Sequence, residues 1–300
     1  MNSVRTIAHD VVRIPVKIGN CYIVGGPQRW TLLDAGTEGN HDRIRNIAEQ
    51  RFGLGARPEC IVLTHGHFDH AGSAGQLARH WDIPICAHRL ELPYLTGRAK
   101  YPPPDPTVGG FMANMVRFFP NRNYDFSEHM RELPMTAVPG MEGWTVYETP
   151  GHTPGHISFF RPADRVLLAG DAFATVNQAS AFAVLTMKPE VSVPPTYYTC
   201  DWEAAYDSVA RLSELDPEVI GAGHGEPMFG AAAREGLRRL ATEWPQPVKG
   251  RYVNQPAKAD HTGPVYIPPP APDPVKWITV GVATAGAIGA GVLWKRRRAA

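Results

Sequence analysis

Short apolar runs alternate with longer amphipathic segments along the first 244 residues of the chain. The short runs are rich in β-branched and aromatic residues, and they predict strands at Val11–Ile18, Cys21–Val24, Trp30–Leu33, Cys60–Leu63, Trp144–Glu148, Ile157–Arg161, Val166–Ala169 and Val219–Ala222. Apolar residues at helical spacing predict helices at His41–Phe52, Ala74–Trp81, Trp202–Leu215 and Ala231–Glu243. This alternation predicts an α/β fold in which helices cover the faces of sheets. We assign residues 1–244 to one folded domain.

Residues 92–135 interrupt this pattern. They hold four prolines between positions 102 and 106, followed by the apolar sequence FMANMVRFFP. A long insertion in a compact domain is often functional, and we interpret it as a lid or wall of a substrate pocket. The side chains expected in that wall are Tyr94, Tyr101, Phe111, Met112, Met115, Phe118 and Phe119 from the insertion, together with Phe173. Such a wall favours an acyl or aromatic small molecule as substrate.

The amino-acid composition of the chain changes after residue 244. Residues 245–276 contain nine prolines, which is typical of an extended linker. Residues 277–294 carry no charge, have a Trp at each end and precede a basic tail at residues 295–300. A helix of that length spans roughly 27 Å, close to the hydrocarbon core of a lipid bilayer at about 30 Å. We therefore predict a single transmembrane helix that anchors the protein in a membrane.

Two expectations follow from this anchor. The first ten residues show no export signal, which favours the cytosolic face of the membrane for the catalytic domain. Small residues recur at every fourth position of the anchor, a spacing that permits two helices to pack closely as a homodimer.

Charge and cysteine content exclude two classes of protein. Thirty Lys and Arg against 29 Asp and Glu give a formal net charge of +1, and Lys295 to Arg298 supply four positive charges, so the rest of the chain carries −3. Without a basic excess we expect no nucleic-acid partner. The four cysteines form no CxxC pair, which excludes a disulfide framework and a thiolate metal site, and we expect buried, reduced thiols.

A dense group of metal-binding residue types follows the predicted strand Cys60–Leu63. Within six residues it contains three histidines and one aspartate, which are His65, His67, Asp69 and His70. Imidazole and carboxylate ligands together suit Zn²⁺ or a similar divalent ion. Three more candidates lie between or at the ends of later predicted strands, namely His152, Asp171 and His224. The seven residues together predict a site for two metal ions.

These residues resemble the metallo-β-lactamase superfamily, whose pattern is HxHxDH followed in order by His, Asp and His. Asp34, in the sequence LLDAG, also matches an aspartate that the family carries at an early strand end. The resemblance covers about residues 10–240, and it implies a four-layer αββα sandwich with the metal site at one edge.

The resemblance also implies roles for the individual residues. One metal ion would be bound by His65, His67 and His152, the second by Asp69, His70 and His224, and Asp171 would bridge them. Asp34 and His156 would lie behind the ligands and orient them. Two Zn²⁺ ions per chain are expected, with Mn²⁺ or Fe as alternatives.

Such a pair of ions lowers the pKa of a bound water toward about 7, and the hydroxide that forms attacks a carbonyl or phosphoryl centre. Asp69 would orient that water or accept its proton. A bridging Asp171 resembles the glyoxalase II-like and lactonase-like branches rather than the true β-lactamases. We therefore predict a binuclear metallo-hydrolase that cleaves an ester, thioester or lactone of an apolar small molecule.

Two departures from those branches leave alternatives open. His224 is followed by GEPMF rather than by basic residues that would hold glutathione, and Phe173 lies near the place where quorum-signal lactonases carry a tyrosine. The alternative is a mononuclear iron enzyme of the persulfide dioxygenase kind, using His65, His152 and Asp171. A phosphodiesterase or nuclease of the same superfamily is less favoured.

Overall fold

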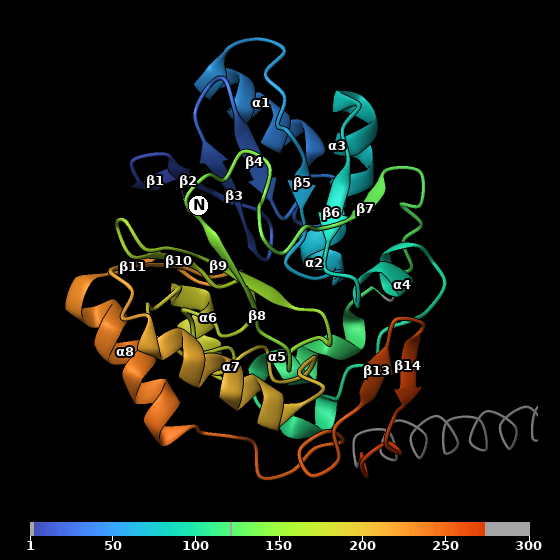
Figure 1. Cartoon of the computed structure of the whole chain (residues 1–300). Helices are drawn as coiled ribbons and strands as arrows, with labels where there is room; N and C mark the ends of the chain where they lie inside the picture. The colour runs from blue at the N-terminus through green and yellow to red at the C-terminus, as the bar shows by residue number, and fades with distance from the viewer. Residues whose placement is uncertain (1–2, 121, 274–300) are drawn as a thin grey trace, which may run out of the picture. The chain divides into compact units, whose positions relative to one another are not determined.

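The computed structural model describes residues 3–120 and 122–273. Met1–Pro268 forms one compact unit, and Pro269–Ala300 is a second. The elements and the site discussed below belong to the first unit (Figure 1).

The first sheet has seven strands that lie in chain order. They are β1 (Arg5–Ala8), β2 (Val11–Pro15), β3 (Asn20–Gly25), β4 (Trp30–Leu33), β5 (Ile61–Val62), β6 (Ile85–Ala87) and β7 (Met130–Glu132). Pairing is antiparallel from β1 to β4 and parallel from β4 to β7.

The second sheet has five strands in the order β12-β11-β10-β9-β8. They are β8 (Thr145–Glu148), β9 (Ile157–Arg161), β10 (Val166–Leu168), β11 (Val219–Gly221) and β12 (Met228–Phe229). Only the β10–β11 pair of this sheet is parallel.

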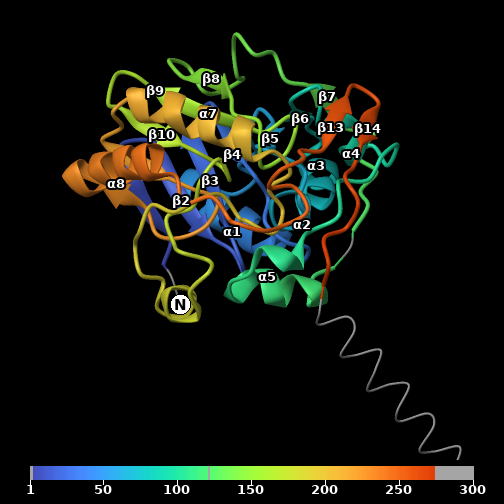
Figure 2. The same cartoon turned by 90° about the horizontal axis from the view of Figure 1, so that it is seen from below.

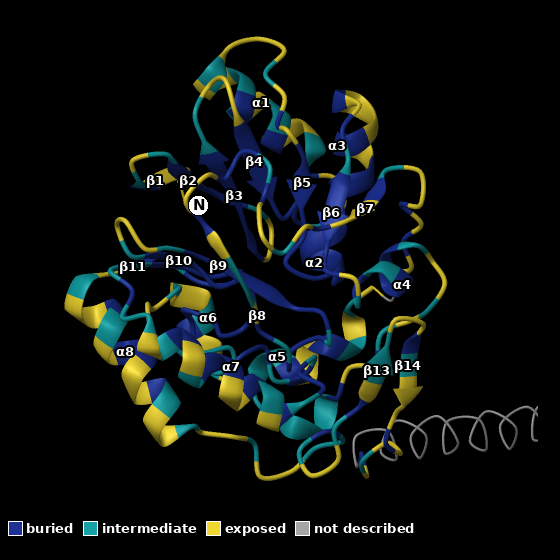
Figure 3. Ribbon diagram, viewed as in Figure 1, coloured by how far each residue is buried: buried dark blue, intermediate teal, exposed yellow. Residues whose placement is uncertain are grey.

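Helices cover the outer face of each sheet. Helices α1 (His41–Phe52) and α3 (Ala74–Trp81) lie over the first sheet, and α7 (Trp202–Glu214) and α8 (Gly230–Glu243) lie over the second (Figures 1 and 2). Each of these helices has one buried stripe and one exposed face (Figure 3). In α7, for example, Asp201 caps the first turn by accepting from the Ala204 N–H, and buried residues recur at Trp202, Ala205, Val209 and Leu212.

Three apolar layers separate the four layers of secondary structure. Successive side chains of a strand point to opposite faces, so on β3 Ile23 packs toward α1 and α3 while Tyr22 packs toward the second sheet. On β10, Leu168 faces the first sheet and Leu167 faces α7 and α8. The predicted α/β sandwich with two sheets is therefore confirmed. All four cysteines are buried and free.

The arrangement of parallel strands positions the site. The carboxyl ends of parallel neighbours meet at the same edge of a sheet, so β4 and β5 deliver Asp34 and His65 to one place. The parallel strands β10 and β11 of the second sheet deliver Asp171 and His224 in the same way. The two edges come together in the folded chain, as the contacts described below show.

The insertion at 92–135 is made of short elements. They are α4 (Leu92–Leu95), the 3₁₀ turns η1 (Pro106–Val108) and η2 (Val116–Phe118), α5 (Phe111–Met115) and the edge strand β7. Ala113 and Val116 bury themselves against Tyr197 and thus attach the insertion to the domain. Two further short helices, α2 (Phe68–Ala71) and α6 (Ala181–Thr186), lie elsewhere in the chain.

Part of the proline-rich stretch folds onto the domain. The strands β13 (Lys258–Asp260) and β14 (Gly263–Tyr266) pair with each other. The Tyr252 hydroxyl donates to the carbonyl of Pro103 at 2.6 Å, and the Ala257 N–H donates to the carbonyl of Cys200 at 2.9 Å. Residues 252–266 are therefore held by pairing and hydrogen bonds within the first unit.

The predicted membrane location has to be corrected. Among residues 3–120 and 122–273, no helix is long and apolar enough to cross a bilayer. The predicted anchor at residues 277–294, with the homodimer contact and the cytosolic placement inferred from it, lies outside the described residues. The membrane assignment therefore has no support and is withdrawn.

We expect the layer between the sheets to dominate stability. Phe159 of β9 is fully buried there, so Phe159→Ala should lower the free energy of unfolding by about 3–5 kcal/mol through lost burial and a residual cavity. The exposed Leu185 provides the control, because Leu185→Ala should change it by less than about 0.5 kcal/mol. Urea denaturation measures the free energy of unfolding of both variants. Equal losses in the two variants would contradict the assignment of Phe159 to a buried layer between the sheets.

Candidate metal centre

Four loops meet at the edge where the two sheets approach each other. Helix α2 begins after His67, so the loop between β5 and α2 presents His65 and His67 while Asp69 and His70 lie in the helix itself. The loops after β8, β10 and β11 supply His152, Asp171 and His224. The side chains of all seven predicted ligands are buried.

One group of three histidines is formed by His65, His67 and His152. Their nearest ring nitrogens lie within 4.8 Å of one another. His67 Nδ1 and His152 Nε2 are 3.0 Å apart, and His65 Nε2 is buried without a hydrogen-bond partner. Three imidazole nitrogens therefore converge on one point.

A second group consists of Asp69, His70 and His224, whose ligand atoms also lie within 4.8 Å of one another. His224 Nε2 is 3.4 Å from Asp69 Oδ2. The other nitrogen of His224, Nδ1, donates to the carbonyl of Ile18 at 2.8 Å, which leaves Nε2 directed toward the group.

Asp171 lies between the two groups. Its Oδ2 is 3.5 Å from His152 Nε2 in the first group, and 3.5 Å from His70 Nε2 and 3.2 Å from His224 Nε2 in the second. Its Oδ1 is buried without a hydrogen-bond partner. This is the position that a carboxylate bridging two ions would occupy.

Asp34 and His156 form hydrogen bonds to two of the candidate ligand residues. His70 Nδ1 lies 2.9 Å from Asp34 Oδ2, and the same carboxylate accepts from the N–H of Thr64 at 2.8 Å. His156 Nε2 accepts the backbone N–H of Asp171 at 2.8 Å, and its Nδ1 is 2.8 Å from the hydroxyl of Thr149. Both residues therefore neighbour candidate ligands, and their predicted role in orienting those ligands stays a prediction.

Burial and neighbouring charges set the protonation of the cluster. Burial lowers the pKa of His65 and His152 and brings the pKa of His67 to about 3, so these three rings are neutral and free to act as ligands. Burial also acts to lower the pKa of His70 and His224, but nearby carboxylates, Asp171 foremost, outweigh it and raise both. A cation bound there would replace those protons.

The donor set fits divalent metal ions. Burying seven titratable side chains together is costly unless opposite charge compensates them. His65 Nε2, His70 Nε2 and Asp171 Oδ1 are buried without hydrogen bonds and face the cluster. Imidazole nitrogens and carboxylate oxygens are suitable ligands for zinc, iron or manganese.

Sequence reasoning missed one buried acid that ties the ligand loops together. Glu91 is fully buried and accepts the N–H of Gly66 at 3.0 Å, the Thr153 hydroxyl at 2.8 Å and the N–H of Gly155 at 2.8 Å. It also accepts the hydroxyl of Tyr101. Glu91 therefore joins the loop of His65 and His67 to the loop of His152. Its only signal in the sequence is an isolated charge inside the apolar run LELPYL.

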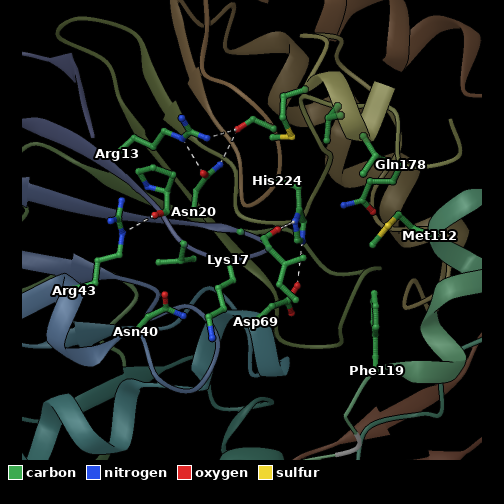
Figure 4. Close-up of a pocket in the computed structure, with 18 of the residues that line it drawn as sticks. Arg13, Lys17, Asn20, Asn40, Arg43, Asp69, Met112, Phe119, Gln178 and His224 are labelled. Atoms are coloured by element: carbon green, nitrogen blue, oxygen red, sulfur yellow. Dashed lines mark hydrogen bonds and ion pairs between the residues drawn. The ribbon is translucent and has the colours of Figure 1, made fainter. Parts of the chain in front are cut away.

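A cavity of about 680 Å³ opens beside the cluster (Figure 4). Asp69 and His224 are the predicted ligands among its lining residues. From the insertion, Met112 and Phe119 line it as expected. The remaining pocket predictions were wrong for this cavity, because its described lining does not include Tyr94, Tyr101, Phe111, Met115, Phe118 or Phe173.

The wrong assignments have physical causes. Tyr94 is buried and stacks on Tyr101 at 4.0 Å between ring centroids, and Phe173 is buried in the layer between the second sheet and its helices. Phe118 is 79% exposed to solvent and Met115 is also exposed. In so short a helical segment, neighbouring apolar residues point in different directions, and only one face meets the cavity.

Comparisons with known proteins agree with this geometry. Residues 14–224 match the family model described as "Metallo-beta-lactamase superfamily". The chain is 43% identical over 239 residues to "Probable metallo-hydrolase YflN" of Bacillus subtilis (strain 168), covering 78% of this chain and 90% of the relative. It is 28% identical to "Hydroxyacylglutathione hydrolase GloC" of Haemophilus influenzae, covering 54% and 70% of the two chains.

One solved structure has a fold similar to that of this chain. The crystal structure of TTHA1623 in a di-iron-bound form aligns with a TM-score of 0.50 at 25% identity, covering 74% of this chain and 96% of that one.

The chain belongs to the metallo-β-lactamase superfamily. The predicted class of enzyme, a metallo-hydrolase, is confirmed by the family and by relatives named as probable metallo-hydrolases.

Substitution of Gly223 tests the cluster without replacing any candidate ligand. A Cβ at this position would collide with Asp171 Oδ1 and lie 2.6 Å from His70 Cε1. Gly223→Ala should therefore displace both side chains and weaken metal binding by at least about tenfold, measured by titration with a chromophoric chelator. Gly26→Ala, where a Cβ meets open space, is the control. Unchanged affinity in Gly223→Ala would show that the two side chains are not ligands.

Glu91→Gln should weaken the metal site without touching a ligand. The amide replaces one acceptor oxygen with a donor that faces other donors, so the two loops separate. We expect about tenfold weaker binding of Co²⁺ and a changed visible spectrum of the Co²⁺ protein. Glu132→Gln on the exposed end of β7 is the matched control. A wild-type spectrum in Glu91→Gln would contradict the positioning role.

Proposed function

We propose that this protein is a binuclear metal-dependent hydrolase that cleaves an ester, thioester or lactone of a small molecule with an apolar part. The observation that carries the proposal is the cavity that reaches Asp69 and His224 directly and continues over the apolar side chains of Met112 and Phe119. A substrate bound in this cavity would thus place its carbonyl carbon beside the candidate ligands.

In this proposal the seven candidate ligands bind two metal ions. His65, His67 and His152 would hold one ion, Asp69, His70 and His224 the other, and Asp171 would contact both. Zinc is our proposed metal, because nitrogen-rich ligand sets of this kind suit it. Divalent ions bound there would supply Lewis acidity, which polarises a carbonyl and lowers the pKa of water.

Asp69 is the proposed proton acceptor. It is the carboxylate among the lining residues of the cavity, and burial raises its pKa above that of an ordinary aspartate. A carboxylate that lines the cavity is placed to accept a proton from a water molecule there. Tyr197 lines the same cavity, and burial raises its pKa so that the hydroxyl stays protonated. That hydroxyl donates to Gln178 Oε1 at 3.2 Å and would exchange this bond for one to a substrate oxygen.

Relatives support the choice of bond. GloC, by its name, hydrolyses a hydroxyacylglutathione, and another relative at 29% identity over 189 residues is an "N-acyl homoserine lactonase" of Bacillus thuringiensis. Arg234 and Arg238, which lie further along the chain in α8, form ion pairs with Glu218 and Asp216 on the surface and do not line the cavity. We therefore propose a substrate other than glutathione thioesters.

The test combines metal content with turnover on the full chain. Protein purified without added metal should contain about two divalent ions per chain and hydrolyse members of a panel of esters, thioesters and lactones. His67→Ala and Asp171→Ala should lower kcat at least about 10³-fold, because each removes a ligand. His80→Ala, an exposed histidine on α3, should match the wild type.

Two outcomes would reject the proposal. One is a protein loaded with two metal ions that cleaves nothing in the panel. The other is a single iron per chain with oxygen uptake on a persulfide, which would move the protein to the dioxygenase class.

A further inference from the structure

The cavity beside the candidate metal centre has two chemically different ends. In Figure 4, Lys17, Asn40 and Arg43 lie on one side of Asp69 and His224, and Met112 and Phe119 lie on the other. A substrate whose reacting bond sits at the candidate ligands would therefore meet polar side chains at one end and apolar side chains at the other.

The polar end carries unbalanced positive charge. The charged residues that line the cavity are Arg13, Lys17, Arg43 and Asp69. Arg13 is already neutralised, because its Nη1 lies 2.9 Å from Glu226 Oε2 and its Nε donates to Asn20. Asp69 faces His224 and is a candidate metal ligand. Lys17 and Arg43, by contrast, form no ion pair with any residue of the described ranges.

The chain holds these two cations next to the metal centre. Lys17 lies in the hairpin loop between β2 and β3, which is closed by the Val16 N–H donating to the carbonyl of Gly19 at 2.9 Å. The candidate ligand His224 donates to the carbonyl of Ile18 in this loop at 2.8 Å. Arg43 Nε, from α1, donates to the carbonyl of Pro15 at the start of the loop at 3.1 Å. Hydrogen bonds thus connect the loop that carries Lys17 to both Arg43 and the candidate ligand His224.

The opposite end is mainly apolar. Besides Met112 and Phe119, its lining includes Val176, Val184 and Met187, and its polar groups, the Gln178 amide and the Tyr197 hydroxyl, are uncharged and bonded to each other at 3.2 Å. Flexible Met side chains adapt to apolar groups of differing shape, and no charged side chain among the described lining residues comes from these segments.

We propose that the substrate is an amphiphilic anion. Its negatively charged group pairs with Lys17 and Arg43, its apolar group lies against Met112 and Phe119, and the carbonyl to be hydrolysed lies between them. This inference rests on the proposed hydrolase function and deepens it by naming the substrate class. It also accounts for a cavity with three basic residues in a chain whose first 294 residues carry a net negative charge.

Two thioesters that differ in one charge provide the probe. They are the hexanoyl thioesters of 3-mercaptopropionate and of 3-mercaptopropionamide, which match in shape. In each, water supplies the hydroxyl group of hexanoic acid, the C–S bond breaks, and the remaining proton goes to the departing thiolate. The ratio of their kcat/KM values therefore reports recognition of the charge alone.

The wild type should prefer the carboxylate by about tenfold, and raising the salt concentration should reduce that preference. Since exposed ion pairs are individually weak, Lys17→Met and Arg43→Met should each lower the ratio about threefold, and the double variant should bring it to about one. Lys258→Met on β13 and Arg239→Met on α8 replace exposed cations away from the cavity lining and should retain the wild-type ratio.

A binding measurement separates this proposal from the hydrolase proposal. Hexanesulfonate, which carries the same anionic and apolar ends but no cleavable bond, should bind the wild type about tenfold more tightly than the double variant in calorimetry. A ratio near one in the wild type, or equal hexanesulfonate affinity in wild type and double variant, would overturn the anionic subsite. Failure of the metal-loaded wild type to cleave either thioester, with the difference in hexanesulfonate affinity intact, would instead reject hydrolysis of this bond.

Discussion

The burial of seven candidate metal ligands where the edges of the two sheets meet constrains the structure around them. Imidazoles and carboxylates lose their hydration there, and three histidines stay neutral because burial lowers their pKa values. Neighbouring carboxylates raise the pKa of His70, so the metal-free cluster binds protons where a metal would bind. Divalent cations bound there would satisfy the atoms of His65, His70 and Asp171 that are buried without hydrogen bonds.

The surrounding structure keeps this cluster in one geometry. Asp34 holds His70, His156 holds the backbone of Asp171, and Glu91 joins the loops that carry the histidines. Space is equally restricted, since a Cβ at Gly223 would overlap the carboxylate of Asp171. The hairpin loop that presents Lys17 is also bonded to His224 through Ile18. The loop of the proposed anion site and the candidate metal centre are thus joined by a hydrogen bond.

Much of this framework could be predicted from the sequence. Each of the four predicted helices appears with nearly the same bounds, and each predicted strand overlaps an observed strand, because apolar periodicity and turn residues are local signals. The HxHxDH run, together with ligand types at or between the ends of predicted strands, identified all seven clustered residues. The strands β6 and β12 were not predicted, because runs of three and two residues carry no clear period.

What the sequence could not provide depends on long-range packing. Glu91 and Arg43 look like ordinary surface charges until the fold brings Gly155 and Pro15 beside them. Phe118 and Met112 have similar apolarity and lie in the same segment, yet only Met112 lines the cavity. Hydrophobic composition alone also suggested a membrane location, for which no helix among the described residues provides a span.

Anomalous X-ray scattering from crystals of the protein purified without added metal tests the central claim most directly. Data collected at the absorption edges of zinc, iron and manganese identify each ion and place it independently of any activity. The account predicts two ions, one bound by His65, His67 and His152, the other by Asp69, His70 and His224, with Asp171 touching both. A single ion, or ions bound away from these side chains, would contradict it.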